Sequence, residues 1–370
     1  MLFLGAGASV PMGIGDIENF TRIIIERTEG NLRNTIDIIQ RILNTSEEFV
    51  NFRFNLEVLY SILDGFSNRW RALTELGPFP ILMHNLLSNN NEFYNLQVSQ
   101  QEFSNFETIV ETEIVNSINS YSYDRTRRRT AKILYDDLFA IPIRSNSRFL
   151  NASGNNVTNV FNMVTTLNYD LVLELYSNDS VGEDRLSTTL DFFRQRGFNN
   201  NNPSMLELTK ILNQQLHPNN RIEYLKLHGS IDWWRGDDNN IYHDFSGQNP
   251  FLQFTERTII YPIYEKYISR EPFFTLYQYF RRNLLFEDIV IVIGYSFADI
   301  SINNAFIDWL TFNNNARLIV ISKKQKQQRI RNIFGNLMNR IEFIEDYFGE
   351  QNFIVNLENL LVNSPQNIRN

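Results

Sequence analysis

The chain of 370 residues contains no cysteine. This absence excludes disulfide frameworks, zinc sites built from thiolates and cysteine nucleophiles. Long hydrophobic runs are also lacking, since the longest, Ile289–Ile293, is far too short to cross a bilayer. No charged and apolar secretory segment opens the chain, which starts directly with a short apolar run and glycines. We therefore expect a cytoplasmic protein with no membrane association.

A surplus of positive charge is missing as well. The 34 Lys and Arg residues are outnumbered by 42 Asp and Glu residues, which gives a formal net charge of −8. An acidic chain is not drawn non-specifically to phosphate backbones, so we expect no direct binding of nucleic acid. The basic run Arg125–Arg129 is interpreted as a solvated helix face. The acidic residues show no clustered ligand spacing, and we expect no metal.

Short runs rich in β-branched residues recur along the chain and end in glycine or polar residues. Apolar runs of this length without alternation are typical of strands buried on both faces of a parallel sheet. Helical stretches such as FTLYQYFRRNLL and INNAFIDWL follow several of them. This alternation predicts an α/β fold, a Rossmann-like doubly wound parallel sheet. The predicted strands are MLFLGAG (1–7), VTTLNYD (164–170), YLKLHGS (224–230), RTIIYP (257–262), DIVIVIGYS (288–296) and RLIVIS (317–322).

A long helical stretch separates the first two predicted strands. A Rossmann crossover needs one helix, whereas apolar residues at three- and four-residue spacing continue over residues 17–157. We therefore predict a helical insertion subdomain at 17–157 and a discontinuous Rossmann-like domain at 1–16 and 158–370. Residues 323–370 are predicted as one or two helices, which leaves no room for a large sensor domain after the last strand.

The opening LFLGAGASVPMGIG places Gly5, Gly7 and Ser9 at a strand end. Glycines let the backbone turn tightly and approach a pyrophosphate, and a helix that follows offers free N–H groups to the anion. Such turns also serve ordinary strand-to-helix packing, and that alternative stays open. The third glycine of the dehydrogenase spacing is missing and no acidic residue follows a nearby second strand, which disfavours hydride transfer.

Three further segments carry a family resemblance: TLNYD at Thr166–Asp170, LHGSIDW at Leu227–Trp233 and IGYSFAD at Ile293–Asp299. Together with GAGAS, this ordered set resembles the sirtuin superfamily and, more specifically, the SIR2-like NADases of bacterial antiphage defence. The resemblance implies that NAD is the substrate. Protein-deacylating sirtuins carry a zinc module held by four cysteines, so its absence here disfavours a deacylase. The implied NAD-binding residues are Gly5, Ala6, Gly7, Ser9, Thr166, Asp170, Gly294 and Ser296.

Two residues are the predicted catalytic pair. Imidazole titrates near neutral pH, so His228 is a candidate base at a strand end. The amide of Asn168 can donate and accept together, which suits a ribose hydroxyl and an attacking water, and the resemblance makes it essential for NAD cleavage. An Asx-turn is the alternative for Asn168, and a helix cap is the alternative for Asp170. Capping explains Asp299 and Asn303 as well as binding does. Ser230 and Asp232 are expected to brace His228.

The leading hypothesis is an NAD glycohydrolase that releases nicotinamide and ADP-ribose and depletes NAD in antiphage defence. The alternative is a non-catalytic subunit that binds NAD or ADP-ribose or acts as a scaffold; a protein deacylase is disfavoured. By analogy with stand-alone SIR2-like chains, we expect a homo-oligomer with a HerA-like hexameric ATPase as partner, or else a short Argonaute.

Overall fold

The computed structural model describes most of the chain and groups it into two compact units. The first comprises Met1–Ile14, Ser120–Ile259 and Ile268–Asn370, and the second comprises Gly15–Asn119 and Ile260–Tyr267. The predicted domain boundary at residues 157 and 158 lies outside the described residues. The described residues are 1–45, 54–67, 96–139, 161, 163–180, 198, 204–213, 223–244, 254–260, 271–323, 326–346, 348–350 and 352–362.

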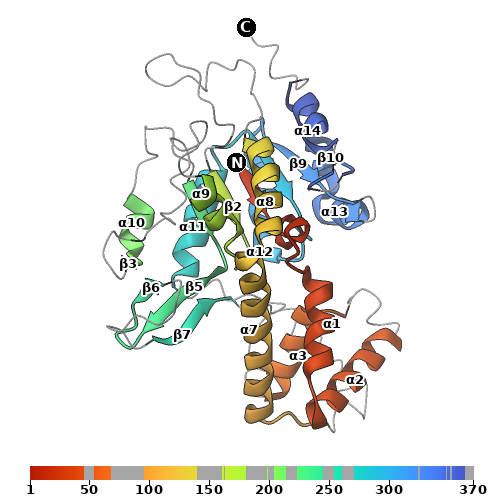
Figure 1. The fold of residues 1–370 in the computed structure, drawn as a ribbon. Coiled ribbons are helices and arrows are strands. Elements are labelled where there is room, and N and C mark those ends of the chain that lie inside the picture. The colour runs from red at the N-terminus through yellow and green to blue at the C-terminus, as the bar shows by residue number, and fades with distance from the viewer. Residues whose placement is uncertain are drawn as a thin grey trace. The chain divides into compact units, whose positions relative to one another are not determined.

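A six-stranded sheet forms the centre of the first unit. Its order is β10-β9-β8-β1-β2-β4, and every neighbouring pair is parallel. Numbered along the chain, this is the 3-2-1-4-5-6 order of Rossmann dinucleotide-binding sheets. The predicted Rossmann-like α/β fold is therefore confirmed (Figure 1). The strands are β1 (Leu2–Leu4), β2 (Met163–Thr166), β4 (Glu223–Lys226), β8 (Ile289–Ile293), β9 (Arg317–Ile321) and β10 (Ile341–Ile344).

Helices flank this sheet. On one face, Phe3 of β1 lies with ring centroids 5.7 Å from Phe280 of the helix that precedes β8 and 5.2 Å from Phe306 of the helix that follows β8. The adjacent residues Leu2 and Leu4 point to the opposite face and are equally buried. Burial on both faces explains the continuous apolar runs. The helices of this unit are α8 (Arg125–Phe139), α9 (Val172–Ser180), α10 (Leu208–Asn213), α11 (Phe273–Leu284), α12 (Ile300–Phe312), α13 (Gln327–Phe334) and α14 (Phe353–Val362).

A second, antiparallel sheet belongs to the same unit. Its order is β3-β6-β5-β7, with strands β3 (Ser204–Met205), β5 (Gly229–Gly236), β6 (Ile241–His243) and β7 (Phe254–Ile259). The run RTIIYP was predicted as a parallel strand, and this was wrong: its described part pairs antiparallel with β5. An apolar run predicts a strand but does not choose its partner. The chain turns between β4 and β5 within two residues, and β5 begins at Gly229, which has a positive φ. This turn takes β5 out of the parallel sheet, and β7 pairs with β5.

The end of the chain departs from the prediction in one element. Residues 323–370 were predicted as helices alone, but β10 lies between α13 and α14 and pairs parallel with β9, Ile341 opposite Leu318. The segment IEFI escapes the pattern for a buried strand because it is an edge strand, and Glu342 and Phe343 are only partly buried. A short 3-10 helix, η6 (Gly335–Arg340), precedes it.

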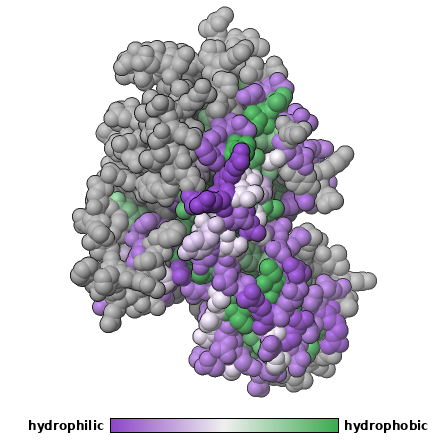
Figure 2. Space-filling view, viewed as in Figure 1, coloured by the Kyte–Doolittle hydropathy of each residue, from purple (hydrophilic) through white to green (hydrophobic). Residues whose placement is uncertain are grey.

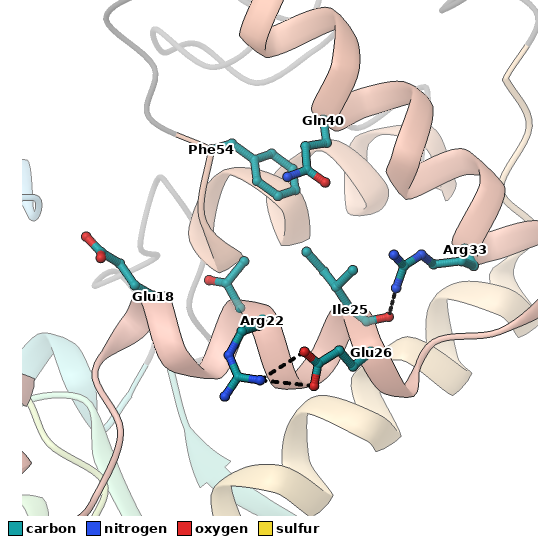
Figure 3. Close-up of a pocket in the computed structure, with 8 residues that line it drawn as sticks. Glu18, Arg22, Ile25, Glu26, Arg33, Gln40 and Phe54 are labelled. Atoms are coloured by element: carbon teal, nitrogen blue, oxygen red, sulfur yellow. Dashed lines mark hydrogen bonds and ion pairs between the residues drawn. The ribbon is translucent and has the colours of Figure 1, made fainter.

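The second unit is helical in the residues that the structure describes. Asp16 begins α1 by accepting a hydrogen bond from the Asn19 amide at 3.0 Å. Helices α1 and α2, with Phe54, line a cavity of about 400 Å³ whose charged residues include Arg22, paired with Glu26 (Figure 3). The helices are α1 (Ile17–Arg27), α2 (Gly30–Thr45), α3 (Leu56–Ser67) and α7 (Gln100–Tyr123), the last of which ends in the first unit.

The described surface is mainly hydrophilic on the face shown in Figure 2, with small separate hydrophobic areas. Among the described helices, none combines the length and the hydropathy that crossing a bilayer requires.

Candidate functional site

Two glycine loops interlock at the carboxyl ends of β1 and β8. The Gly5 amide donates to the Ile293 carbonyl and the Gly7 amide to the Gly294 carbonyl, each at 2.9 Å. Gly294 has φ +67°, and a Cβ there would lie 2.1 Å from the Ala8 nitrogen, so only glycine fits. Between β1 and β8 the strand order reverses, and doubly wound sheets bind ligands at this point.

The loop after β1 does not lead directly into an α-helix. Two 3-10 turns, η1 (Ala6–Ala8) and η2 (Val10–Met12), follow, and α1 begins only at Ile17. The prediction that an α-helix follows this loop directly is therefore wrong. Within GAGAS, the Ala8 amide donates to Gly5 and the Ser9 amide to Ala6. Among the residues of GAGAS, Ala6 is exposed, and its amide is the N–H without a backbone acceptor among the described loop bonds.

Asn168 lies against the glycine loop. Its Nδ2 donates to the Gly5 carbonyl at 3.1 Å and to Ser9 Oγ at 3.0 Å. Ser9 Oγ in turn donates to Asp170 Oδ2 at 2.7 Å. The Asn168 amide N–H donates to Thr166 Oγ1 at 3.0 Å, so this turn is made by the threonine side chain and is not the Asx-turn considered for Asn168. Thr166 Oγ1 in turn donates to the Leu4 carbonyl at the end of β1 at 3.2 Å. With both Nδ2 hydrogens used, the side chain offers a ligand its Oδ1 acceptor.

Asp170 contributes to the framework of this cluster. Its Oδ2 accepts from Ser9, while its Oδ1 accepts from the Val172 amide at 3.1 Å, at the start of α9. The carboxylate is buried. Both carboxylate oxygens are thus engaged by the protein, which favours the helix-start alternative for this residue over a ribose contact.

His228 follows β4 as Asn168 follows β2. The two strands pair with Thr166 opposite Lys226, and the Leu227 amide continues the pairing by donating to the Thr166 carbonyl at 2.9 Å. Both side chains therefore belong to neighbouring strand ends at one edge of the sheet. His228 is buried, with only 3% of its side chain exposed. Gly229 follows with φ +79°, and a Cβ there would lie 2.1 Å from the Thr258 carbonyl oxygen.

The ion-pair partner of His228 is Asp299, for which the sequence allowed either helix capping or ligand binding. Asp299 Oδ2 lies 3.3 Å from His228 Nε2, and both side chains are almost fully buried. We expected Ser230 and Asp232 to brace the histidine. The structure instead places Ser230 Oγ 2.7 Å from Lys226 Nζ, and Asp232 Oδ2 2.8 Å from His243 Nε2.

Lys226 is a residue that sequence reasoning missed. Its side chain is fully buried, and its Nζ donates to the Asp170 carbonyl at 2.5 Å and to Glu174 Oε1 at 3.0 Å. Burial raises the pKa of Glu174, and the Lys226 charge only partly offsets this. A buried ammonium costs several kcal/mol unless it is well bonded. A lysine inside the apolar run YLKL was the available signal.

The loop after β8 carries the remaining predicted residues. Ser296 lies half-buried in it, between Gly294 and Asp299. Asn303 Nδ2 donates to the Phe297 carbonyl at 3.0 Å, and the Tyr295 hydroxyl lies 3.2 Å from Asn303 Oδ1. Asn303 therefore holds this loop in place.

This Rossmann-like fold carries an amide and an imidazole just after neighbouring strands, at the edge where such sheets bind ligands. Residues 162–343 match the family model described as a SIR2-like domain, and this match supports the SIR2-like superfamily. SIR2-like domains bind NAD, and the match is consistent with an NAD-related activity in general terms. No curated protein matches the chain. Within the described residues, no group of three His, Asp or Glu side chains is placed to hold a metal ion.

Proposed function

We propose that the chain is an NAD glycohydrolase, which adds water across the nicotinamide–ribose bond and releases nicotinamide and ADP-ribose. One observation carries the proposal: Asn168 and His228 lie at the ends of paired parallel strands, inside the match to a SIR2-like domain. The interlocked glycine loops lie at the end of β1, the strand beside β2.

The reaction makes modest demands on the protein. Positive charge develops on the ribose, and nicotinamide leaves as a neutral molecule, so no acid is needed to protonate it. Asn168 Oδ1 accepts a hydrogen bond from a ribose hydroxyl or the attacking water. His228 takes the proton that the water or hydroxyl loses, a step worth on the order of 10²–10⁴ in rate. Burial of the imidazole keeps bulk solvent away.

In the cell, we propose that the enzyme depletes NAD as an effector of antiphage defence in the cytoplasm. We further propose a homo-oligomer that works with a HerA-like hexameric ATPase, with a short Argonaute as the second choice of partner. These assignments rest on the resemblance of the four motifs and on analogy. Co-purification with the product of a neighbouring gene tests the choice of partner.

The activity is tested by incubating the purified chain with NAD and no peptide, followed by chromatographic measurement of nicotinamide. His228→Ala and Asn168→Ala are each expected to lower the release rate about 100-fold or more, with unchanged circular dichroism. Asn304→Ala is the matched control, because Asn304 is exposed on α12. Full activity in both site variants contradicts the assignment of the site.

The two other functions give different results in the same assay. A non-catalytic NAD- or ADP-ribose-binding subunit gives calorimetric binding without nicotinamide. A deacylase releases nicotinamide only when an acylated peptide is added. Nicotinamide release from NAD alone separates the proposed hydrolase from both.

A further inference from the structure

Asp299 uses its two carboxylate oxygens for two different tasks. Oδ1 accepts from the amides of Ser301 at 2.9 Å and Ile302 at 3.2 Å, and so caps the N-terminus of α12. Oδ2 lies 3.3 Å from His228 Nε2. Asparagine, serine or threonine would cap the helix as well. The cap alone therefore does not account for a charged carboxylate buried beside an imidazole, which is costly unless the two groups are paired.

The loop that carries Asp299 is held firmly. The Tyr295 hydroxyl donates to the Asp299 carbonyl at 3.1 Å, and Asn303 ties down the Phe297 carbonyl. Phe297 has φ +56°, a left-handed conformation that a bulky residue adopts only when its surroundings enforce it. The position of Asp299 Oδ2 is thus set by the packing of the loop and by α12.

This geometry has a chemical consequence for His228. A neutral imidazole has one N–H donor and one acceptor nitrogen. Nε2 and Oδ2 lie at ion-pair distance but are not hydrogen-bonded to each other, so the pairing acts through charge. The negative charge next to Nε2 also stabilises the imidazolium that forms when the ring accepts a proton. In a catalytic triad a buried aspartate likewise stabilises the imidazolium of the base, there through a hydrogen bond to Nδ1–H.

We propose that Asp299 is a positioning residue for His228: its carboxylate, at ion-pair distance, holds the imidazole in place and stabilises the imidazolium formed during cleavage of NAD. This inference rests on the proposed function for its catalytic part. Its structural part, the pairing of Asp299 with His228, is independent of any substrate.

Other ionisable groups near His228 have partners of their own. The Tyr169 ring, from the connection between β2 and α9, lies 6.5 Å from the imidazole centroid. Asp170 in the same connection is bonded to Ser9. On either side of His228 along the chain, Lys226 is paired with Glu174 and Asp232 with His243. In the described part of the chain, Asp299 is thus the charged group at ion-pair distance from the ring.

The experiment compares Asp299→Asn with a matched aspartate cap. Asparagine keeps the cap of α12 and removes the charge. Asp124→Asn is the control, since Asp124 Oδ1 accepts from Thr126 at 2.9 Å and Arg127 at 3.2 Å, the same pattern at the start of α8. Proton NMR follows the titration of the four histidines, with His228 assigned by its loss in His228→Gln. The pH profile of nicotinamide release is measured on the same proteins.

In Asp299→Asn, the pKa of His228 is expected to fall by about one unit, because the opposite charge at ion-pair distance is gone. The acidic limb of the kcat profile moves to lower pH by the same amount. At the plateau, kcat falls about 10–100-fold while KM stays within about twofold. Asp124→Asn changes neither readout. If Asp299→Asn fails to fold, Asp299→Glu keeps the charge and displaces it, and kcat falls while His228 still titrates near its wild-type pKa.

An unchanged His228 titration in Asp299→Asn overturns the pairing. An unchanged acidic limb with a normal KM overturns the positioning role. A wild-type chain that releases no nicotinamide refutes the proposed hydrolase instead, and the NMR titration alone then decides whether Asp299 and His228 are coupled.

Discussion

Replacing Gly294 by alanine tests the interlocked glycine loops directly. Gly294 has φ +67°, and its added Cβ would lie 2.1 Å from the Ala8 nitrogen and 2.4 Å from the Gly7 carbonyl carbon. The left-handed backbone costs an alanine roughly 1–2 kcal/mol. Relief of the overlap requires the two loops to separate by on the order of 1 Å, at a cost of roughly 1–3 kcal/mol for an overpacked site. We expect a total loss of about 2–5 kcal/mol in the free energy of unfolding.

Gly30 provides a control with the same backbone and no overlap. It also has φ +67°, but its added Cβ would meet nothing within 4 Å. Gly30→Ala should therefore lose only the strain, roughly 1–2 kcal/mol. The difference between the two variants isolates the contact between the loops. Urea denaturation followed by tryptophan fluorescence measures both losses.

The same change is expected to affect the proposed activity. Separation of the loops displaces Gly5 and Ser9, to which the Asn168 side chain is bonded. A displacement of about 1 Å in a catalytic group can cost about 100-fold in rate. Nicotinamide release by Gly294→Ala should fall by that order, while Gly30→Ala keeps the wild-type rate. Equal stability losses in the two variants would refute the close-packing argument.

Two further predictions concern the buried ionic groups. The pKa of His243 is raised, because its hydrogen bond to Asp232 and the charge of that carboxylate outweigh the effect of burial. The pair therefore stabilises the fold fully below about pH 6.5, the pKa of an unfolded histidine. This stabilisation is lost as the pH rises through the raised pKa of the folded state. His243→Gln should thus be more destabilising at pH 6 than at pH 9 in urea denaturation, and an equal loss at both would contradict the pairing. Lys226→Met should cost about 3–5 kcal/mol, because it leaves Glu174 buried without its cation. Burial already raises the pKa of Glu174, so this loss should grow from pH 5 to pH 8, and Glu174→Gln in the same chain should recover part of it.

The central sheet could be predicted because its strands are buried on both faces. In a strand such as Ile289–Ile293 both faces are covered by the protein, so the run is continuously apolar and the sequence pattern agrees with the burial. The motifs at the strand ends followed from the same reasoning, because parallel strands bring their carboxyl ends to one edge. Ser9, Thr166, Asn168 and Asp170 are indeed bonded to one another there.

The rest depended on contacts between residues far apart in the chain. Nothing in the spacing of His228 and Asp299 distinguishes an ion pair from two separate strand-end residues, and a helix cap explained the aspartate equally well. Edge strand β10 and the antiparallel sheet were missed for a related reason: pairing partners are chosen by turn geometry, which the apolar pattern does not encode.

The turn at Leu227–His228 joins a strand of the parallel sheet to a strand of the antiparallel sheet. The backbone of His228 is therefore held by both sheets: by the parallel sheet, whose strand β2 leads to Asn168, and by the antiparallel sheet. In the proposed hydrolase, a change in the orientation of the antiparallel sheet would therefore move His228 while leaving the glycine loops in place. The proposed mechanism thus depends on both sheets for the position of its base, and on the parallel sheet alone for the glycine loops.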